Sequence, residues 1–107
     1  VTNADRMREA IDYGADFVVS PGTTQALWDA SVKHQLPILP GFSSASEAMT
    51  LMELGSHCGK FFPAEASGGV SYLKSLAGPF PDFPPFLPIN CATFARDFLI
   101  FSVIILD

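Results

Sequence analysis

Short apolar runs, each closed by a turn of proline, glycine or polar residues, are the feature that most constrains the fold of this chain. These runs have the length and the β-branched or aromatic composition of buried strands. Short strands that are apolar on both faces are typical of a parallel sheet covered by helices. The pattern therefore predicts an α/β fold in which strands and helices alternate. Strands are expected at residues 16–20, 36–41, 58–64, 86–89 and 102–106.

The segments between these runs carry the signals of amphipathic helices. Asn3, Thr24 and Ser44 are suitable N-cap residues, and Ser44 begins a capping-box pattern with an acid three residues later. Further helices are expected over residues 69–76 and 93–100. Helical periodicity selects the residues that should face the core. They are Met7, Ala10, Ile11, Ala26, Leu27, Ala30, Ser31, Ala48, Met49, Leu51, Met52 and Leu54.

Two architectures fit this alternation, an open doubly wound sheet and a (β/α)8 TIM barrel. No GxGxxG motif follows an expected strand, which weakens the nucleotide-binding version of the doubly wound sheet. The turns SPG, LPG, FPAE and LPIN would instead lie at the catalytic end of a barrel. The sequence supplies about five of a barrel's eight strands, begins without methionine and stops directly after an apolar run. We therefore expect residues 1–107 to form a single domain, a partial barrel truncated at both ends.

Charge and cysteine content exclude several classes of function. Lysine and arginine number 6 against 11 acidic residues, and no basic patch is visible, so we expect no nucleic-acid partner. The most apolar run, residues 98–106, is shorter than the roughly 20 residues of a membrane span, so we expect no membrane partner. Cys58 and Cys91 have neither CxxC spacing nor a histidine cluster around them. This favours reduced cytosolic thiols over a disulfide or a metal site.

A single lysine, Lys60, stands inside one of the apolar runs. A lysine near a strand end is usually a surface residue whose stem packs and whose charge stays in water. If Phe61 faces the helices, however, strand alternation turns Lys60 and Phe62 toward the other face, which is the interior of a barrel. A desolvated lysine has a lowered pKa, and its neutral amine can form a Schiff base with a ketone. Both interpretations of Lys60 are compatible with the residues alone.

The stretch GKFFPAEASGGVSYLKSLAGPFPD, which begins at Gly59, resembles a known active-site strand and its following helix. The resemblance is to the 2-keto-3-deoxy-6-phosphogluconate (KDPG) and 4-hydroxy-2-oxoglutarate (KHG) aldolases, whose pattern is KFFPAExxGG, a helix, and then GPF. GADFVVSPG and LPILPG also resemble the preceding strands of that family, at the right distances. The resemblance covers nearly all of residues 1–85 and is specific, because it joins several motifs in order.

This resemblance implies a class I aldolase on a (β/α)8 barrel, a lyase that cleaves 2-dehydro-3-deoxy-6-phosphogluconate to pyruvate and glyceraldehyde 3-phosphate. It implies that Lys60 is the catalytic, imine-forming residue, and that Pro21 and Phe62 are substrate-binding residues beside it. It implies a phosphorylated 2-keto acid as the small-molecule partner, with no metal and no cofactor. It further implies a homotrimer in the cytoplasm, acting in the Entner–Doudoroff pathway of carbohydrate metabolism.

Parts of the family pattern are not found in this sequence. The family's general base, a glutamate in a pattern like E-[IV]-T-x-R, would precede Val1, together with an arginine that binds the pyruvate carboxylate. Pro88-Ile89-Asn90 stands where Pro-Thr-Gly-Gly-Ile-Asn would be expected. The missing Thr-Gly-Gly helps to bind phosphate through backbone N–H groups. We therefore expect this chain alone to have no useful aldolase activity.

Several alternatives stay open. Glu65 is either a second acid of the site or a surface or helix-capping residue. Ser67, Gly68 and Gly69 form either an anion-binding helix start or a helix entry that needs small residues. The substrate can also be 4-hydroxy-2-oxoglutarate or 2-dehydro-3-deoxy-6-phosphogalactonate. Two functions compete with an aldolase: a phosphate-binding barrel in which Lys60 only neutralises an anion, and a non-catalytic fragment that associates through unpaired strand edges.

Overall fold

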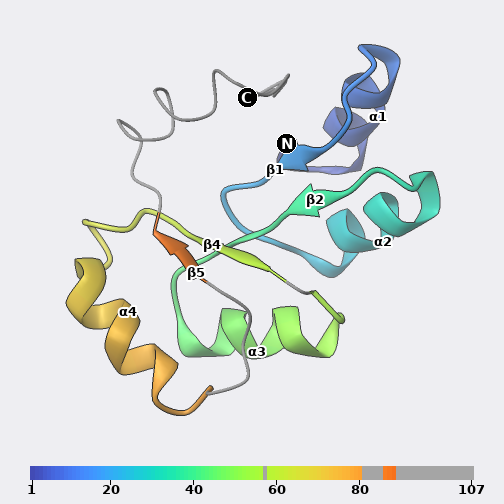
Figure 1. Ribbon diagram of the computed structural model, residues 1–107. Coiled ribbons are helices and arrows are strands. Elements are labelled where there is room, and N and C mark those ends of the chain that lie inside the picture. Colours follow the sequence, from blue (N-terminus) through green and yellow to red (C-terminus); the bar gives the residue numbers. More distant parts are fainter. Residues whose placement is uncertain (57, 81–85, 89–107) are drawn as a thin grey trace.

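The computed structural model describes residues 1–56, 58–80 and 86–88, and strands and helices alternate along them as expected (Figure 1). The predicted helix over 93–100 and the predicted strand over 102–106 lie outside the described residues. The elements are α1 (Ala4–Asp12), β1 (Val18–Val19), α2 (Gln25–His34), β2 (Ile38–Leu39), β3 (Gly41–Phe42), α3 (Ala45–Glu53), β4 (Gly59–Phe61), α4 (Gly69–Ala77) and β5 (Phe86–Pro88).

All of the strand pairs in the described part of the chain are parallel. β1 pairs with β2, and β3, β4 and β5 form a second sheet in that order. Strand order therefore follows chain order, with no reversal of the kind that defines a doubly wound sheet. β1, β3 and β4 are each followed by a helix (α2, α3 and α4) and then by the next strand of the chain, which is the repeat of a (β/α)8 barrel.

The predicted strand over residues 36–41 differs from the observed one, because Pro40 divides it into β2 and β3. Proline has no backbone N–H, so it cannot donate to a strand ladder. The carbonyl of Leu39 accepts from the amide of Ser20 at 3.2 Å, and the carbonyl of Pro40 accepts from the amide of Lys60 at 2.8 Å. One segment thus bonds to β1 through its first half and to β4 through its second half, which joins the two sheets.

The expected N-caps begin the first three helices. Asn3, Thr24 and Ser44 each accept a hydrogen bond from the backbone amide three residues later. The capping box at Ser44 is only half formed. The carboxylate of Glu47 accepts from the hydroxyl of Ser44 at 2.9 Å, where a full box would bond the N-cap amide. The predicted strand over 58–64 is also shorter, because β4 ends at Phe61 and turns follow it.

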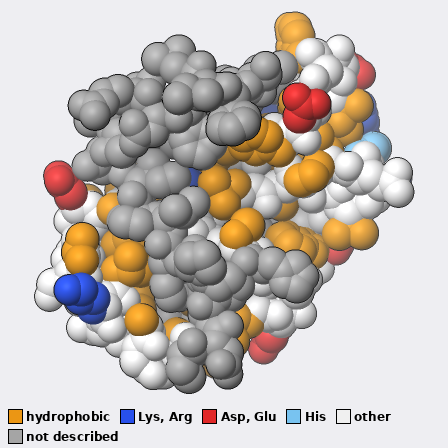
Figure 2. Space-filling model, in the orientation of Figure 1, with side chains coloured by type: hydrophobic (Ala, Val, Ile, Leu, Met, Phe, Trp, Pro, Cys, Tyr) orange, Lys and Arg blue, Asp and Glu red, His pale blue; other side chains and the backbone are white. Residues whose placement is uncertain are grey.

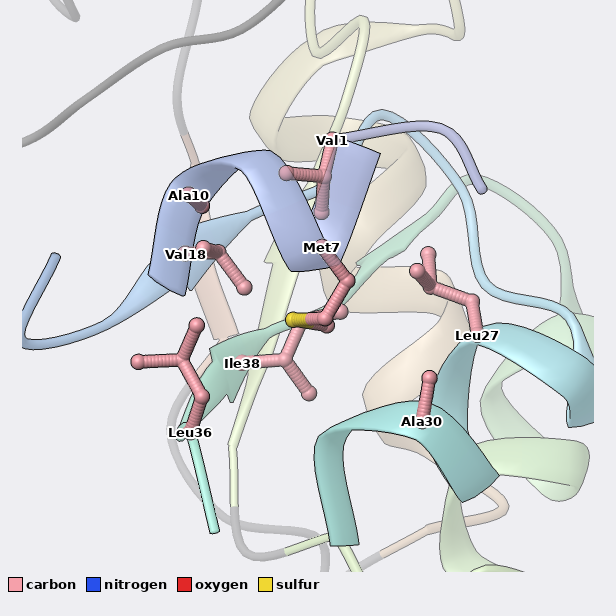
Figure 3. Packing of buried hydrophobic residues seen from close by; sticks show 8 residues of the cluster. All are labelled: Val1, Met7, Ala10, Val18, Leu27, Ala30, Leu36 and Ile38. Carbon is pink, nitrogen blue, oxygen red and sulfur yellow. The ribbon is translucent and has the colours of Figure 1, made fainter. Parts of the chain in front are cut away.

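Two hydrophobic clusters hold the helices against the strands. The first joins α1 and α2 to β1 and β2, and Figure 3 shows Met7 of α1 reaching toward Ile38 of β2. The second joins α3 and α4 to β3 and β4. The members of the first cluster are Val1, Met7, Ala10, Val18, Leu27, Ala30, Leu36 and Ile38. Those of the second are Phe42, Ala48, Leu51, Phe61, Ala64, Leu73 and Leu76.

Three residues that were predicted to face the core are exposed instead. They are Ala26 of α2 and Met49 and Met52 of α3. Only Ala48 and Leu51 of α3 are buried, so the apolar stripe that packs on the sheet is narrower than the sequence pattern suggested. No helix in the described ranges is long and apolar enough to cross a membrane.

Candidate active site

Lys60 lies on the face of the sheet that points away from the helices. Its neighbour Phe61 is fully buried in the second cluster, against α3 and α4. Gly59 faces the same way, because a Cβ built on it would lie 2.8 Å from Cε1 of Phe42 and 3.6 Å from Cδ1 of Leu51. Since side chains alternate along a strand, Lys60 faces the opposite side. In a barrel this side is the interior.

The Lys60 side chain is withdrawn from solvent and lies against an aromatic ring. The residue is only 5% exposed. Its Nζ lies 4.7 Å from the centroid of the Phe62 ring, within the range of a cation–π contact. Phe62 is half-buried. The structure therefore places the predicted pair together, on the predicted face.

Pro21, the other predicted substrate-binding residue, is exposed, and its backbone approaches β3 closely. A Cβ built on Gly41 would lie 2.1 Å from the Pro21 carbonyl oxygen and 2.6 Å from that of Ser20. Gly41 is the register partner of Lys60 in the pairing of β3 with β4. The SPG turn after β1 is thus brought next to the strand position that faces Lys60.

The alternative residues of the sequence analysis lie after β4. Glu65 is exposed. The backbone amides of Ser67, Gly68 and Gly69 already donate to carbonyls of the preceding turn, at 3.0, 3.1 and 2.8 Å. Amides that are bonded in this way are not offered to an anion. The geometry thus supports the helix-entry interpretation, in which small residues are needed for the turn, and Gly68 and Gly69 have φ values of 120° and 67°.

Two features near Lys60 were missed from the sequence. Ser20 is 0% exposed, and its Oγ has no hydrogen-bond partner among the described residues. The sequence pattern predicts Gly41 only as the residue that closes the strand over 36–41, whereas its missing side chain makes room for the Pro21 carbonyl. The signal for both was the pair of motifs SPG and LPG, which place small residues at adjacent strand ends.

Within the ranges that the structure describes, no group of three or more histidine, cysteine, aspartate or glutamate side chains could hold a metal ion. Cys58 is a half-buried free thiol and His34 is exposed, whereas His57 and Cys91 lie outside the described residues. On the exposed surface of α1, the hydrogen bond and charge of Glu9 raise the pKa of Arg6. The described basic side chains on the face drawn in Figure 2 lie apart from one another.

Comparison with known proteins agrees with this geometry. The family model for KDPG and KHG aldolases matches residues 1–106. The chain is 50% identical over 82 residues to the 2-dehydro-3-deoxy-phosphogluconate aldolase of Pseudoalteromonas atlantica. This match covers 77% of the chain and 38% of that protein. It is 43% identical over 101 residues to the KHG/KDPG aldolase of Escherichia coli, and this match covers 92% of the chain and 47% of that protein.

Solved structures of the same kind have the same fold. One such structure is the KDPG aldolase of Legionella pneumophila, with pyruvate captured as a covalent carbinolamine intermediate. It matches this chain with a TM-score of 0.76 and 35% sequence identity, and the match covers 96% of this chain and 51% of the Legionella chain. The KDPG aldolase of Zymomonas mobilis with 3-phosphoglycerate matches this chain with a TM-score of 0.77 and 37% sequence identity. That match covers 91% of this chain and 47% of the Zymomonas chain.

These matches assign the fold and the family together. The fold is part of a (β/α)8 barrel, as the strand order indicates. The chain spans about two fifths to half of the length of the curated relatives that it matches. Because the family model extends over almost all of the sequence, the chain belongs to the KDPG and KHG aldolase family.

Proposed function

We propose that this chain carries the imine-forming half of a class I aldolase, with Lys60 as the nucleophile. The observation that carries this proposal is the position of Lys60, which is buried and faces the side of the sheet away from the helices. Burial in a dry site disfavours an ammonium ion relative to a free amine. Only the free amine attacks a ketone, so this placement favours the required form of the lysine.

In the proposed reaction the amine is the nucleophile, and the iminium ion that it forms is a temporary electron sink. Nζ of Lys60 adds to the C2 carbonyl of a 2-keto acid and gives a carbinolamine, which takes up a proton and loses water to become an iminium ion. A base removes the proton of the C4 hydroxyl, and the electron pair of the C3–C4 bond moves toward the iminium nitrogen, so that an aldehyde leaves and an enamine of pyruvate remains. Protonation at C3 and hydrolysis release pyruvate and return the free amine. Because the imine accepts the electrons, these steps need no metal and no cofactor.

Phe62 and Pro21 are the proposed substrate-binding residues. The Phe62 ring lies 4.7 Å from the lysine nitrogen, where its face can stabilise a cationic imine by about 1 kcal/mol. Pro21 belongs to the turn whose backbone lies against the register partner of Lys60. We propose that this turn borders the pyruvate part of the substrate.

The proposed substrate is a phosphorylated 2-keto-3-deoxy sugar acid, with 2-dehydro-3-deoxy-6-phosphogluconate first. The names of the relatives support this class, as does the phosphorylated three-carbon acid in the Zymomonas structure. 4-Hydroxy-2-oxoglutarate is the main alternative, because one group of relatives is named for both activities. We also propose the trimeric state, the cytoplasmic location and the Entner–Doudoroff role that the resemblance implied.

Turnover by the 107-residue chain alone is not expected. Retro-aldol cleavage requires a base that removes the proton of the C4 hydroxyl, and the family pattern puts this base before Val1. We therefore predict imine formation without useful cleavage. Release of pyruvate from the phosphorylated substrate by the isolated chain, in a coupled dehydrogenase assay, would contradict that prediction.

Reductive trapping tests the imine itself. The chain is incubated with pyruvate and borohydride, and its intact mass is measured beside that of a Lys60→Arg variant, which keeps the charge but cannot form an imine. The proposal predicts a reduced pyruvate adduct on the natural chain and none on the variant. No adduct on either protein, with pyruvate still bound, would favour the phosphate-binding barrel in which Lys60 only neutralises an anion. No adduct and no binding, with concentration-dependent association in sedimentation, would favour the non-catalytic fragment.

A further inference from the structure

The turn after β1 crosses directly over Gly41 of β3. A Cβ on Gly41 would lie 2.1 Å from the carbonyl oxygen of Pro21, 2.4 Å from its carbonyl carbon and 2.6 Å from the carbonyl oxygen of Ser20. All three atoms belong to backbone, which cannot swing aside as the end of a long side chain can. No residue other than glycine fits at position 41 while the turn keeps this course.

This close approach is on the face of the sheet where Lys60 lies. Phe42 is fully buried in the second cluster and faces the helices, so Gly41, the preceding residue, faces the other way. Gly41 is paired in register with Lys60, and the Lys60 amide donates to the carbonyl of Pro40 at 2.8 Å. The Pro21 carbonyl therefore occupies the space, next to the base of the Lys60 side chain, that a side chain at position 41 would fill.

We propose that Gly41 is a positioning residue for the imine chemistry: its missing side chain lets the Ser20–Pro21 backbone rest on β3 and sets the distance between that turn and Lys60. This inference rests on the proposed function. The hydroxyl of Thr23 adds a second link, because its Oγ1 donates to the carbonyl of Gly41 at 3.4 Å. One residue of β3 thus holds the turn through a backbone contact at one end and a long hydrogen bond at the other.

Gly78, directly after α4, supplies a matched glycine-to-alanine control outside this turn. A Cβ on Gly78 would lie 3.5 Å from the carbonyl oxygen of Ser75, which is an ordinary contact, and its φ of −53° lies outside the left-handed range. A Cβ on Gly41 would instead push the turn by more than an ångström, since ordinary contacts begin at 3.4 Å. Displacement of about an ångström at groups that orient a reaction can lower its rate by up to about a hundredfold.

The test compares Gly41→Ala, Gly78→Ala and Leu51→Ala in the full chain. Leu51→Ala weakens the second cluster on the helix-covered face, so it reports the effect of lost stability alone. Trapping by pyruvate and borohydride is followed at the Lys60 peptide over a range of pyruvate concentrations, per folded molecule as judged by circular dichroism. Gly78→Ala and Leu51→Ala should keep the natural trapping efficiency. Gly41→Ala should lower it by about tenfold to a hundredfold, mainly through a higher half-saturating pyruvate concentration.

A second pair of variants tests the inference if Gly41→Ala does not fold. Thr23→Val removes the hydroxyl that bonds to the Gly41 carbonyl and keeps the shape, and it should lower trapping efficiency by roughly threefold. Thr23→Ser keeps the hydroxyl and should restore the natural value. If a folded Gly41→Ala variant traps pyruvate as efficiently as the natural chain, the role of Gly41 is overturned. If Gly41→Ala does not fold, natural trapping efficiency in Thr23→Val overturns it in the same way. Absence of any adduct on the natural chain is a different result, which overturns the proposed function and the inference together.

Discussion

The amine nitrogen of Lys60 lies 4.7 Å from the centre of the Phe62 ring, on the side of the sheet opposite the helices. The ring limits the orientations of the lysine and offers its electron-rich face to a cation. The neighbouring Phe61 points the other way and packs at 5.8 Å from Phe42 and 5.7 Å from Tyr72, measured between ring centroids. Two adjacent phenylalanines therefore serve opposite faces, one the core and one the candidate site.

This division predicts different effects for the same substitution. Phe62→Leu should lower the yield of reduced pyruvate adduct about fivefold, because a cationic imine loses roughly 1 kcal/mol of ring stabilisation. Phe61→Leu should instead lower the free energy of unfolding by about 1 kcal/mol or more, because two ring contacts are lost. Its adduct yield per folded molecule should match the natural chain. Equal yields from Phe62→Leu and the natural chain would contradict the assignment of that ring to the site.

Two of the buried serines, Ser20 and Ser31, predict opposite responses to alanine. The hydroxyl of Ser31 donates to the carbonyl of Leu36 at 2.7 Å, whereas the hydroxyl of Ser20 has no partner among the described residues. Ser31→Ala should lower the free energy of unfolding by about 1 kcal/mol. Ser20→Ala should leave it unchanged or raise it by up to about 1 kcal/mol, since a buried hydroxyl without a bond is unfavourable. Urea unfolding measures both. A loss in Ser20→Ala as large as that in Ser31→Ala would show that the Ser20 hydroxyl is bonded in solution.

Gly59 should be intolerant of a side chain for a reason unrelated to the site. An alanine Cβ would lie 2.8 Å from the Phe42 ring, so Gly59→Ala should lower the free energy of unfolding by roughly 1 to 3 kcal/mol through overpacking. Adding Phe42→Leu should recover part of this loss, because the smaller side chain makes room. Gly22→Ala is the control and should stay within about 0.5 kcal/mol of the natural chain. Additive losses in the double variant would show that the Phe42 ring is not the obstacle.

Local patterns predicted much of this structure because they depend on neighbouring residues only. The N-caps at Asn3, Thr24 and Ser44 follow from a hydrogen bond within one helical turn. The face on which Lys60 lies follows from the alternation of a strand, once Phe61 is assigned to the core. The family motif then connected that face with a chemistry, which alternation alone could not do.

Other features depend on residues distant in sequence, and these were missed. The division of one strand into β2 and β3 reflects bonding to two different neighbours, on either side of Pro40. Met49 and Met52 have the periodicity of core residues, but α3 packs on the sheet through a narrower stripe. The role of Gly41 depends on the path of the turn after β1, which is distant from Gly41 in sequence and cannot be inferred from its neighbouring residues.

The three lysines of the chain allow the most direct test of the central claim, because each is an internal control for the others. Lys33 and Lys74 are exposed and Lys60 is buried. After treatment with pyruvate and borohydride, peptide mapping gives the fraction of each lysine that carries the reduced adduct. If Lys60 is an inward-facing imine former, it should be labelled first and at the lowest pyruvate concentration, although it is the least accessible. Labelling of Lys33 and Lys74 in proportion to their exposure, with Lys60 unmodified, would contradict that account.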